Sequence, residues 1–202
     1  MKVNFIDCGA HKGQSIIYAR SLYGNDLNFY SFEPLPFFSN WLTDYYKNDN
    51  KVKIYNKAVW KENIKKMFYI SKSKASWGSS LTDRFEKDDT IPIEVECINF
   101  SQWVKNNLIK SEYNILKLDI EGAECEVLNK MMDDDTLSYF NNLVGEWHEN
   151  HGGFTSNKFS QTKKRLRDEY NTEMSIWEAP WYNEESTPGM VIMGSENVIW
   201  KK

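Results

Sequence analysis

The first fifteen residues constrain the fold of this chain more than any other stretch. Residues 3–7 form a short apolar run that ends in an acid, residues 8–13 contain two glycines, and a helical pattern opens at Gln14. A buried strand, a glycine turn and a helix N-terminus in this order build a ligand-binding turn at the carboxyl end of a parallel strand. We therefore expect an α/β fold whose ligand site lies at its N-terminal strand.

The spacing of the glycines narrows the class of ligand. The turn has the form D-x-G-A-x-x-G, with Asp7, Gly9 and Gly13 at its fixed positions. A dinucleotide fingerprint has another glycine two residues after the first, where the backbone approaches a pyrophosphate. That position is His11 here, and its side chain would obstruct a diphosphate. The pattern favours a nucleoside ligand without phosphates.

Two further apolar runs end in acids. Residues 27–32 lead into Glu33, and an acid about 20 residues beyond a glycine turn is placed to accept hydrogen bonds from ribose hydroxyls. Residues 115–124, ILKLDIEGAE, lead from a buried-strand pattern into Asp119, Glu121 and Glu124. Because parallel strands end at the same edge of a sheet, we expect these acids beside the glycine turn.

Five segments together resemble a known family. DCGAHKG, FEP, NKAVW, WGSSL and LKLDIEGAE occur in this order over about residues 3–149, and they resemble the FkbM family of S-adenosylmethionine (SAM) dependent methyltransferases. The resemblance implies one class I methyltransferase domain over residues 1–202, which methylates a hydroxyl of a sugar, a glycan or another small molecule. The cofactor-binding residues that it implies are Asp7, Gly9, Ala10, Gly13, Gln14, Ser15, Glu33, Pro34, Ala58 and Asp119.

Alternating strand and helix patterns predict a doubly wound, Rossmann-like, mostly parallel sheet. We expect strands at residues 27–32, 52–55, 113–118 and 142–147, and helices at 14–23, 37–46, 99–108, 121–131 and 158–170. Residues 66–98 hold two alternating strands around a polar segment, which predicts a small β insertion. Residues 190–193 and 198–200 predict a hairpin that forms the antiparallel edge of the main sheet.

Composition limits the classes of function. The 202 residues, 41% of them hydrophobic, suit one domain with a sizeable core. No stretch is apolar over the roughly 18 or more residues of a membrane span and no signal peptide is visible, so we expect a soluble cytoplasmic protein without membrane partners. The net charge of −4 argues against nucleic acid as a partner. The widely spaced Cys8, Cys97 and Cys125 predict buried free thiols.

The acids at the predicted strand ends are candidates for chemistry. Methyl transfer from a sulfonium is an in-line displacement, and a hydroxyl acceptor must also lose a proton, so a positioned base assists. We expect Asp119 to act as the catalytic or acceptor-orienting residue, although an acid there also suits the start of the next helix. Glu121 is a second candidate. His148, with an ordinary pKa near 6.5, is a candidate general base.

The acceptor site draws on two other stretches. Because WGSSL resembles a family segment near the active site, Trp77, Ser79 and Ser80 are expected at a sugar-facing rim, and Glu146 is expected to contact the acceptor from the next strand end. Asp119, Glu146 and His148 are also a possible set of ligands for a divalent metal that orients a sugar diol, although no contiguous metal motif supports it.

Three other functions share parts of this pattern. A NAD-dependent oxidoreductase has the same strand, turn and ribose acid, but requires the glycine that His11 replaces. A nucleic-acid 2′-O-methyltransferase requires a basic groove and a lysine-centred catalytic set, which the acidic charge balance disfavours. A non-catalytic SAM-fold module keeps the same pattern. The sequence begins almost at its first predicted strand, without the leading helical segment of many FkbM members. Such a beginning is also expected of one domain of a larger glycan-modifying polypeptide.

Overall fold

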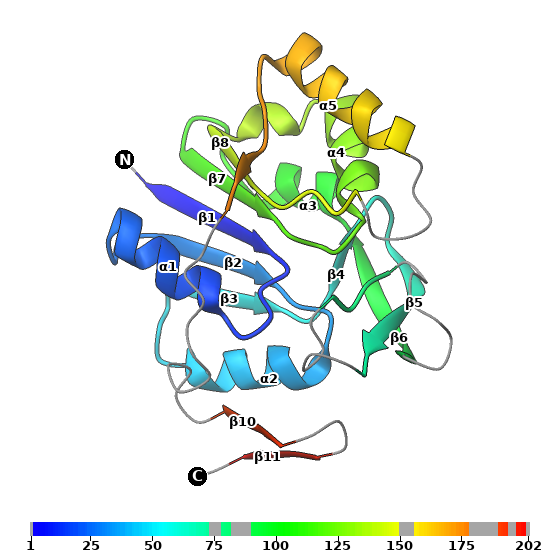
Figure 1. Ribbon diagram of the computed structural model, residues 1–202. Coiled ribbons are helices and arrows are strands. Elements are labelled where there is room, and N and C mark those ends of the chain that lie inside the picture. The colour runs from blue at the N-terminus through cyan, green and yellow to red at the C-terminus, as the bar shows by residue number, and fades with distance from the viewer. Residues whose placement is uncertain are drawn as a thin grey trace.

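The computed structural model describes residues 2–72, 78–81, 90–149, 156–177, 190–193 and 197–200. Its centre is a six-stranded sheet with the order β3-β2-β1-β7-β8-β9, in which all neighbours are parallel (Figure 1). The strands are β1 (Val3–Cys8), β2 (Asn28–Phe32), β3 (Val52–Tyr55), β7 (Tyr113–Leu118), β8 (Asn142–Gly145) and β9 (Ser175–Ile176). The strand order reverses between β1 and β7, and such a switch point is where an open α/β sheet binds its ligand.

Helices cover both faces of this sheet, as the sequence predicts (Figure 1). One face carries α1 (Gln14–Tyr23) and α2 (Pro36–Tyr45), and the other carries α3 (Phe100–Asn107), α4 (Glu124–Asp133) and α5 (Ser156–Tyr170). Alternation along β1 explains the two cores: Phe5 packs in the cluster that contains Ile16 of α1, and Ile6 packs in the cluster that contains Leu128 of α4. The predicted doubly wound architecture is confirmed.

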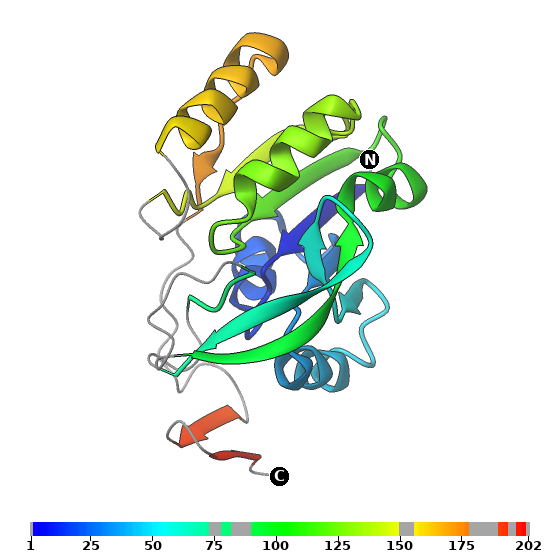
Figure 2. The same cartoon turned by 90° about the vertical axis from the view of Figure 1, so that its right-hand side faces the viewer.

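A second, smaller sheet lies beside the main one (Figure 2). It consists of β4 (Ala58–Trp60), β5 (Ile64–Ser71) and β6 (Thr90–Asn99) in the order β4-β6-β5. β5 and β6 are antiparallel, which confirms the predicted β insertion at residues 66–98. The sequence did not predict β4, which pairs in parallel with β6. Phe68 and Val95 are buried in the same core cluster as Phe5, so the inner face of this sheet packs on the main domain.

The C-terminal hairpin differs from the prediction in its place. β10 (Met190–Met193) and β11 (Asn197–Trp200) pair in antiparallel fashion as predicted, but they form a sheet of their own. The edge strand beside β8 is instead β9, which is parallel to it. β8, α5 and β9 form a βαβ unit, and a helical crossover of this kind returns the chain in the parallel direction. The predicted antiparallel edge is therefore wrong for the six-stranded sheet.

Helix α4 begins at Glu124 rather than at Glu121 as predicted. Glu121 and Gly122 have φ values of 58° and 105°, which no α-helix accommodates. The carboxylate of Glu124 folds back over this turn and accepts hydrogen bonds from the N–H groups of Ile120 and Gly122, at 3.2 and 3.0 Å. Glu121 and Glu124 therefore do not share a helix face.

The three cysteines agree with the expectation from their spacing. Cys8, Cys97 and Cys125 are buried and free, as predicted. Burial raises the pKa of the Cys8 thiol well above its ordinary value, which makes it a poor nucleophile. None of the described helices is long and apolar enough to cross a bilayer.

Candidate functional site

A pocket runs along the carboxyl ends of the parallel strands, between the main sheet and the insertion. The empty space within it is about 1230 Å³, a figure that includes open solvent at its mouth. The predicted site residues that line it are Gly9, Ala10, Gln14, Ser15, Glu33, Pro34, Ala58, Ser79, Asp119, Glu121 and Glu146. Among the described residues, Asp7, Gly13, Ser80 and His148 lie just outside this lining, and Trp77 is outside the part of the chain that is described.

Backbone contacts hold the glycine turn that follows β1. Gly9 has a φ of +90°, and a Cβ atom there would lie 1.9 Å from the carbonyl oxygen of Asp119, so only glycine fits. The N–H groups of Gly9 and Ala10 both donate to the carbonyl of Phe32, at 3.1 and 3.0 Å. The turn thereby ties the ends of β1, β2 and β7 together and brings bare backbone to the pocket.

Glu33, just after β2, reaches back to the same turn. Its two carboxylate oxygens accept hydrogen bonds from the N–H groups of His11 and Leu35, both at 2.8 Å. The residue is 4% exposed, and burial raises the pKa of Glu33 to about 7, although these two N–H groups oppose the shift. Each carboxylate oxygen can accept a second hydrogen bond, so the predicted contact with ribose hydroxyls remains open to Glu33.

His11 occupies the position of the missing glycine. Its φ is 47°, its ring lies 4.2 Å from the ring of Phe38 between centroids, and it lines the pocket. A side chain at this point fills space that a pyrophosphate would need. The position of His11 therefore favours a nucleoside without a diphosphate, which stays a prediction.

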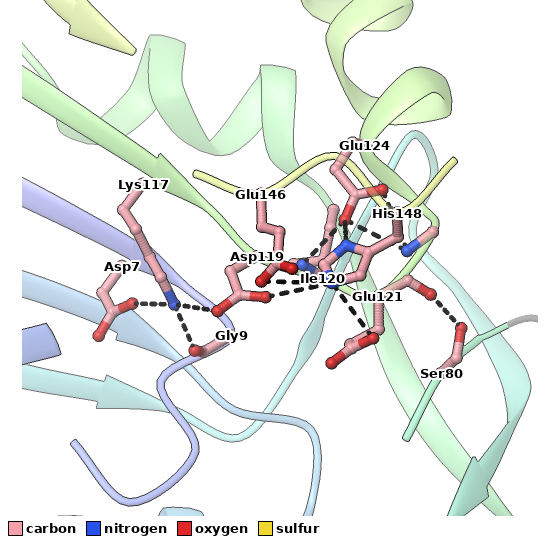
Figure 3. A network of polar contacts seen from close by, with 11 residues as sticks. Asp7, Gly9, Ser80, Lys117, Asp119, Ile120, Glu121, Glu124, Glu146 and His148 are labelled. Carbon is pink, nitrogen blue, oxygen red and sulfur yellow. Dashed lines mark hydrogen bonds and ion pairs between the residues drawn. The ribbon is translucent and has the colours of Figure 1, made fainter. Parts of the chain in front are cut away.

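A buried lysine joins the glycine turn to the acids (Figure 3). Lys117, on β7, donates a hydrogen bond to the carbonyl of Gly9 at 2.7 Å. Its Nζ atom lies 3.2 Å from Oδ1 of Asp7 and 3.3 Å from Oδ2 of Asp119. Burial alone would lower the pKa of Lys117, but Asp119 and Asp7 outweigh it and raise that pKa above its ordinary value. Burial raises the pKa of Asp7, which Lys117 partly offsets.

Lys117 is a site residue that sequence reasoning missed. A lysine is usually solvent-exposed, and no motif singled this one out. The available signal was its position inside the buried run ILKL, which carries charge where an apolar residue is expected. Its partner on β1 is Asp7, which lies directly opposite Lys117 in the strand register.

His148 lies among four carboxylates at the ends of β7 and β8 (Figure 3). Its Nδ1 atom is 2.8 Å from Oε1 of Glu124. Its Nε2 atom is 3.3 Å from Glu121, 3.7 Å from Asp119 and 3.8 Å from Glu146. Burial alone would lower the pKa of His148, but the acids around it raise it to about 9. This arrangement favours a protonated His148 at neutral pH, whereas the predicted role of general base requires the neutral imidazole.

Two backbone features hold Glu121 beside His148. Glu121 has a left-handed conformation, which is strained for a residue other than glycine and is often retained at functional sites. The hydroxyl of Ser80 donates to the carbonyl of Glu121 at 2.6 Å. Ser80, expected to bind the acceptor, therefore fixes the turn that carries Glu121.

Asp119 does not cap the next helix. It contacts Lys117 and lies near His148, and α4 has Ala123 rather than Asp119 at its N-cap.

The same cluster has the geometry of a metal site. One potential ligand atom from each of Asp119, Glu146 and His148 lies within 4.8 Å of the others. Glu124 is buried and contacts the remaining nitrogen of His148, as carboxylates behind metal-binding histidines do. Carboxylate and imidazole ligands suit divalent cations such as Mn²⁺. With His148 protonated, the imidazolium takes the place of such a cation and balances the acids.

The parallel sheet, the glycine turn and the acids at the strand ends define the class I methyltransferase fold. Residues 7–173 match the methyltransferase FkbM domain, and the chain belongs to this family. A search of curated proteins found no match. Among solved structures, methyltransferase FkbM from Methylobacillus flagellatus KT is similar with a TM-score of 0.42 and 14% identity. The match covers 66% of this chain and 30% of that one, so this chain spans less than a third of that protein.

Proposed function

We propose that this chain is a SAM-dependent O-methyltransferase that acts on a hydroxyl of a sugar, a glycan or another small molecule. The observation that carries this proposal is one continuous pocket, which extends from the glycine turn to the acids after β7 and β8. Membership in the FkbM methyltransferase family supports methyl transfer as the reaction. When bound, SAM supplies a methyl group that is activated by a sulfonium.

The residues at the turn bind the nucleoside part of the cofactor. The backbone of Gly9 and Ala10 approaches it closely, and Glu33 accepts hydrogen bonds from the ribose hydroxyls with the capacity that His11 and Leu35 leave. Ala58, at the start of β4, borders the base. The same pocket extends to Asp119 and Glu146, where an acceptor would lie beside a nucleoside cofactor.

The residues after β7 and β8 orient the acceptor and take up its proton. Asp119 and Glu121 both line the pocket, with side chains 35% and 23% exposed, so an acceptor hydroxyl can reach them. The Nε2 atom of His148 lies 3.7 Å from Asp119 and 3.3 Å from Glu121, so a protonated ring would hold both carboxylates in place. Ser79 and the more exposed Glu146 complete the rim of the acceptor site. Fixing the acceptor oxygen in line with the methyl group is the main requirement of the reaction.

The partner that we propose is a small-molecule or glycan acceptor in the cytoplasm, without nucleic acid or membrane. The net charge of −4 supports the exclusion of nucleic acid, because phosphates are bound mainly by Lys and Arg.

Calorimetric titration with SAM and, separately, with NADH tests the cofactor. We expect the protein to bind SAM with micromolar affinity and Glu33→Ala to weaken this binding about tenfold, since a hydrogen bond to a charged carboxylate contributes about 1.5 kcal/mol. Glu62→Ala, an exposed acid outside the pocket lining, is the matched control and should bind as the wild type does. If the protein bound NADH but did not bind SAM, the proposed function would be an oxidoreductase and not a methyltransferase.

Transfer of labelled methyl from SAM to a panel of sugars tests the reaction. The expected product is an O-methylated sugar. Loss of turnover with EDTA, and its recovery with Mg²⁺ or Mn²⁺, would assign Asp119, Glu146 and His148 to a metal; turnover that is insensitive to EDTA would leave them to direct catalysis. SAM binding without transfer to any member of the panel or to larger glycans would indicate a non-catalytic module.

A further inference from the structure

Lys117 carries a positive charge in the middle of the protein. Its side chain is 2% exposed, its neighbours Leu116 and Leu118 on β7 are fully buried, and the strand register places Asp7 directly opposite it. Apolar residues of similar volume often replace a buried ion pair without loss of stability. The fold alone therefore does not require a lysine at this position.

Three neighbours anchor the ammonium group of Lys117. Its Nζ atom donates a hydrogen bond to the Gly9 carbonyl and forms ion pairs with Asp7 and Asp119, whose oxygens lie 3.2 and 3.3 Å away. These contacts hold the ammonium group at the wall of the pocket. Lys117 can therefore influence a reaction through the groups that it holds.

Two of those groups are neighbours that serve different parts of the proposed site (Figure 3). Gly9 forms the turn that we assign to the cofactor, and Asp119 is the acid that we assign to the acceptor. The oxygen of Asp119 that does not face Lys117 lies 3.7 Å from Nε2 of His148. One ammonium thus sets where Asp119 stands relative to the cofactor turn. An in-line displacement is sensitive to this distance, because a misplacement of about 1 Å can cost roughly 100-fold in rate.

We propose that Lys117 is a positioning residue, which holds the carboxylate of Asp119 and the carbonyl of Gly9 in the relative geometry that methyl transfer needs. This role rests on the function proposed above. This role accounts for a buried charge that the apolar pattern of β7 does not explain.

The test needs a background in which Lys117 can be removed without a buried, unbalanced acid. Lys117→Met alone leaves Asp7 without its counter-charge, so Asp7→Asn serves as the reference and Asp7→Asn/Lys117→Met as the test variant. Calorimetry gives the SAM dissociation constant, and turnover is measured with the best acceptor of the sugar panel. Relative to the reference, we expect kcat to fall about 10- to 100-fold and the SAM dissociation constant to rise about three- to tenfold.

A double-mutant cycle separates positioning from a purely structural role. In the Asp7→Asn/Asp119→Asn background, adding Lys117→Met should leave kcat within about twofold, because the group through which Lys117 acts is already altered. The SAM dissociation constant should still rise, because the contact with Gly9 is still lost. Losses in kcat that multiply across the two sites would overturn the proposal.

A readout that needs no acceptor is the crystal structure of Asp7→Asn/Lys117→Met beside that of Asp7→Asn. We expect the Asp119 carboxylate to move by about 1 Å or more between the two, on the scale at which rates respond. An unmoved carboxylate, or a folded test variant with the kcat and SAM affinity of the reference, would overturn the role of Lys117 alone. A wild-type protein that binds no SAM would overturn the proposed function and this role together.

Discussion

The two ends of the pocket are built from different groups. At the β1 turn, backbone dominates: the N–H groups of Gly9 and Ala10 are fixed on Phe32, and even Glu33 is held by N–H groups. At the ends of β7 and β8, charged side chains dominate, with His148 surrounded by acids. Sheet topology fixes the first end, whereas charge balance fixes the second. Changes at the turn should therefore cost folding or cofactor affinity, and changes at the acids should cost turnover.

The largest effect is expected at the turn, from Gly9→Ala. The added Cβ would lie 1.9 Å from the Asp119 carbonyl, so the ends of β1 and β7 must separate. We expect a loss of about 4 kcal/mol or more in the free energy of unfolding, as for the severest single substitutions. Gly24→Ala is the matched control, since it has a similar φ of +85° but nothing within 4 Å, and should cost about 1–2 kcal/mol. Equal losses in urea unfolding would contradict the close approach.

At the acid end, Asp119→Asn should leave the fold intact and remove turnover. We expect kcat to fall about 100-fold or more, on the scale of a lost general base, while the SAM dissociation constant stays within a few fold. Asp44→Asn, an exposed acid paired with Lys47, is the control and should keep full activity. Full activity in Asp119→Asn would show that this residue takes no part in the mechanism. It would also contradict the expectation that changes at the acids cost turnover.

The pH dependence of SAM affinity tests the role of Glu33 at the cofactor end of the pocket. Its pKa of about 7 lies above the ordinary 4.5, because burial disfavours the charged form. If only the ionised carboxylate accepts hydrogen bonds from the ribose, SAM affinity should fall about tenfold between pH 8 and pH 6. Glu33→Gln should flatten this dependence in calorimetric titrations. A wild-type affinity that is constant over this range would disconnect Glu33 from the cofactor.

The raised pKa of Glu33 also affects the free energy of unfolding, with the opposite dependence on pH. The folded protein holds the Glu33 proton more tightly than the unfolded chain, so the contribution to stability is complete below pH 4.5 and is lost as pH rises through about 7. Comparing urea unfolding of the wild type and Glu33→Gln across this range isolates the contribution of Glu33, which should be absent in the variant.

The smallest effect is expected from Ser80→Ala, which removes the hydrogen bond to the Glu121 carbonyl. We expect a loss of about 1 kcal/mol in stability and about threefold in kcat, because the turn that holds Glu121 loosens. Ser21→Ala removes a similar bond, at 2.7 Å to the Tyr18 carbonyl on the exposed side of α1, and should leave kcat unchanged. Equal kcat values in the two variants would show that Ser80 does not act through Glu121.

The backbone end of the pocket was the more predictable one. Apolar runs, glycine spacing and the distance to Glu33 are local properties of the sequence, and they predicted β1, the turn and the acid after β2. Register and long-range contacts are not local. The pairing of Lys117 with Asp7 depends on the register between two strands, and the bond between His148 and Glu124 depends on how the end of β8 lies beside α4, so neither could be predicted from spacing.

The acid end shows where the sequence pattern misled. The predicted helix over residues 121–131 would place Glu121 and Glu124 on one face, yet the positive φ of Glu121 and Gly122 delays the helix start to Glu124. The two acids therefore approach His148 from different sides, Glu124 at Nδ1 and Glu121 at Nε2. The pKa of His148 also departs from the ordinary histidine value, since Glu124, Glu121 and Asp119 raise it to about 9.

The most direct test of the whole account is a crystal structure of the protein with S-adenosylhomocysteine, the product form of the cofactor. We expect ribose hydroxyls hydrogen-bonded to the Glu33 carboxylate, the nucleoside against the Gly9 turn, and the sulfur facing the part of the pocket that Asp119 lines. A ligand bound elsewhere, with Glu33 still bonded only to His11 and Leu35, would contradict it.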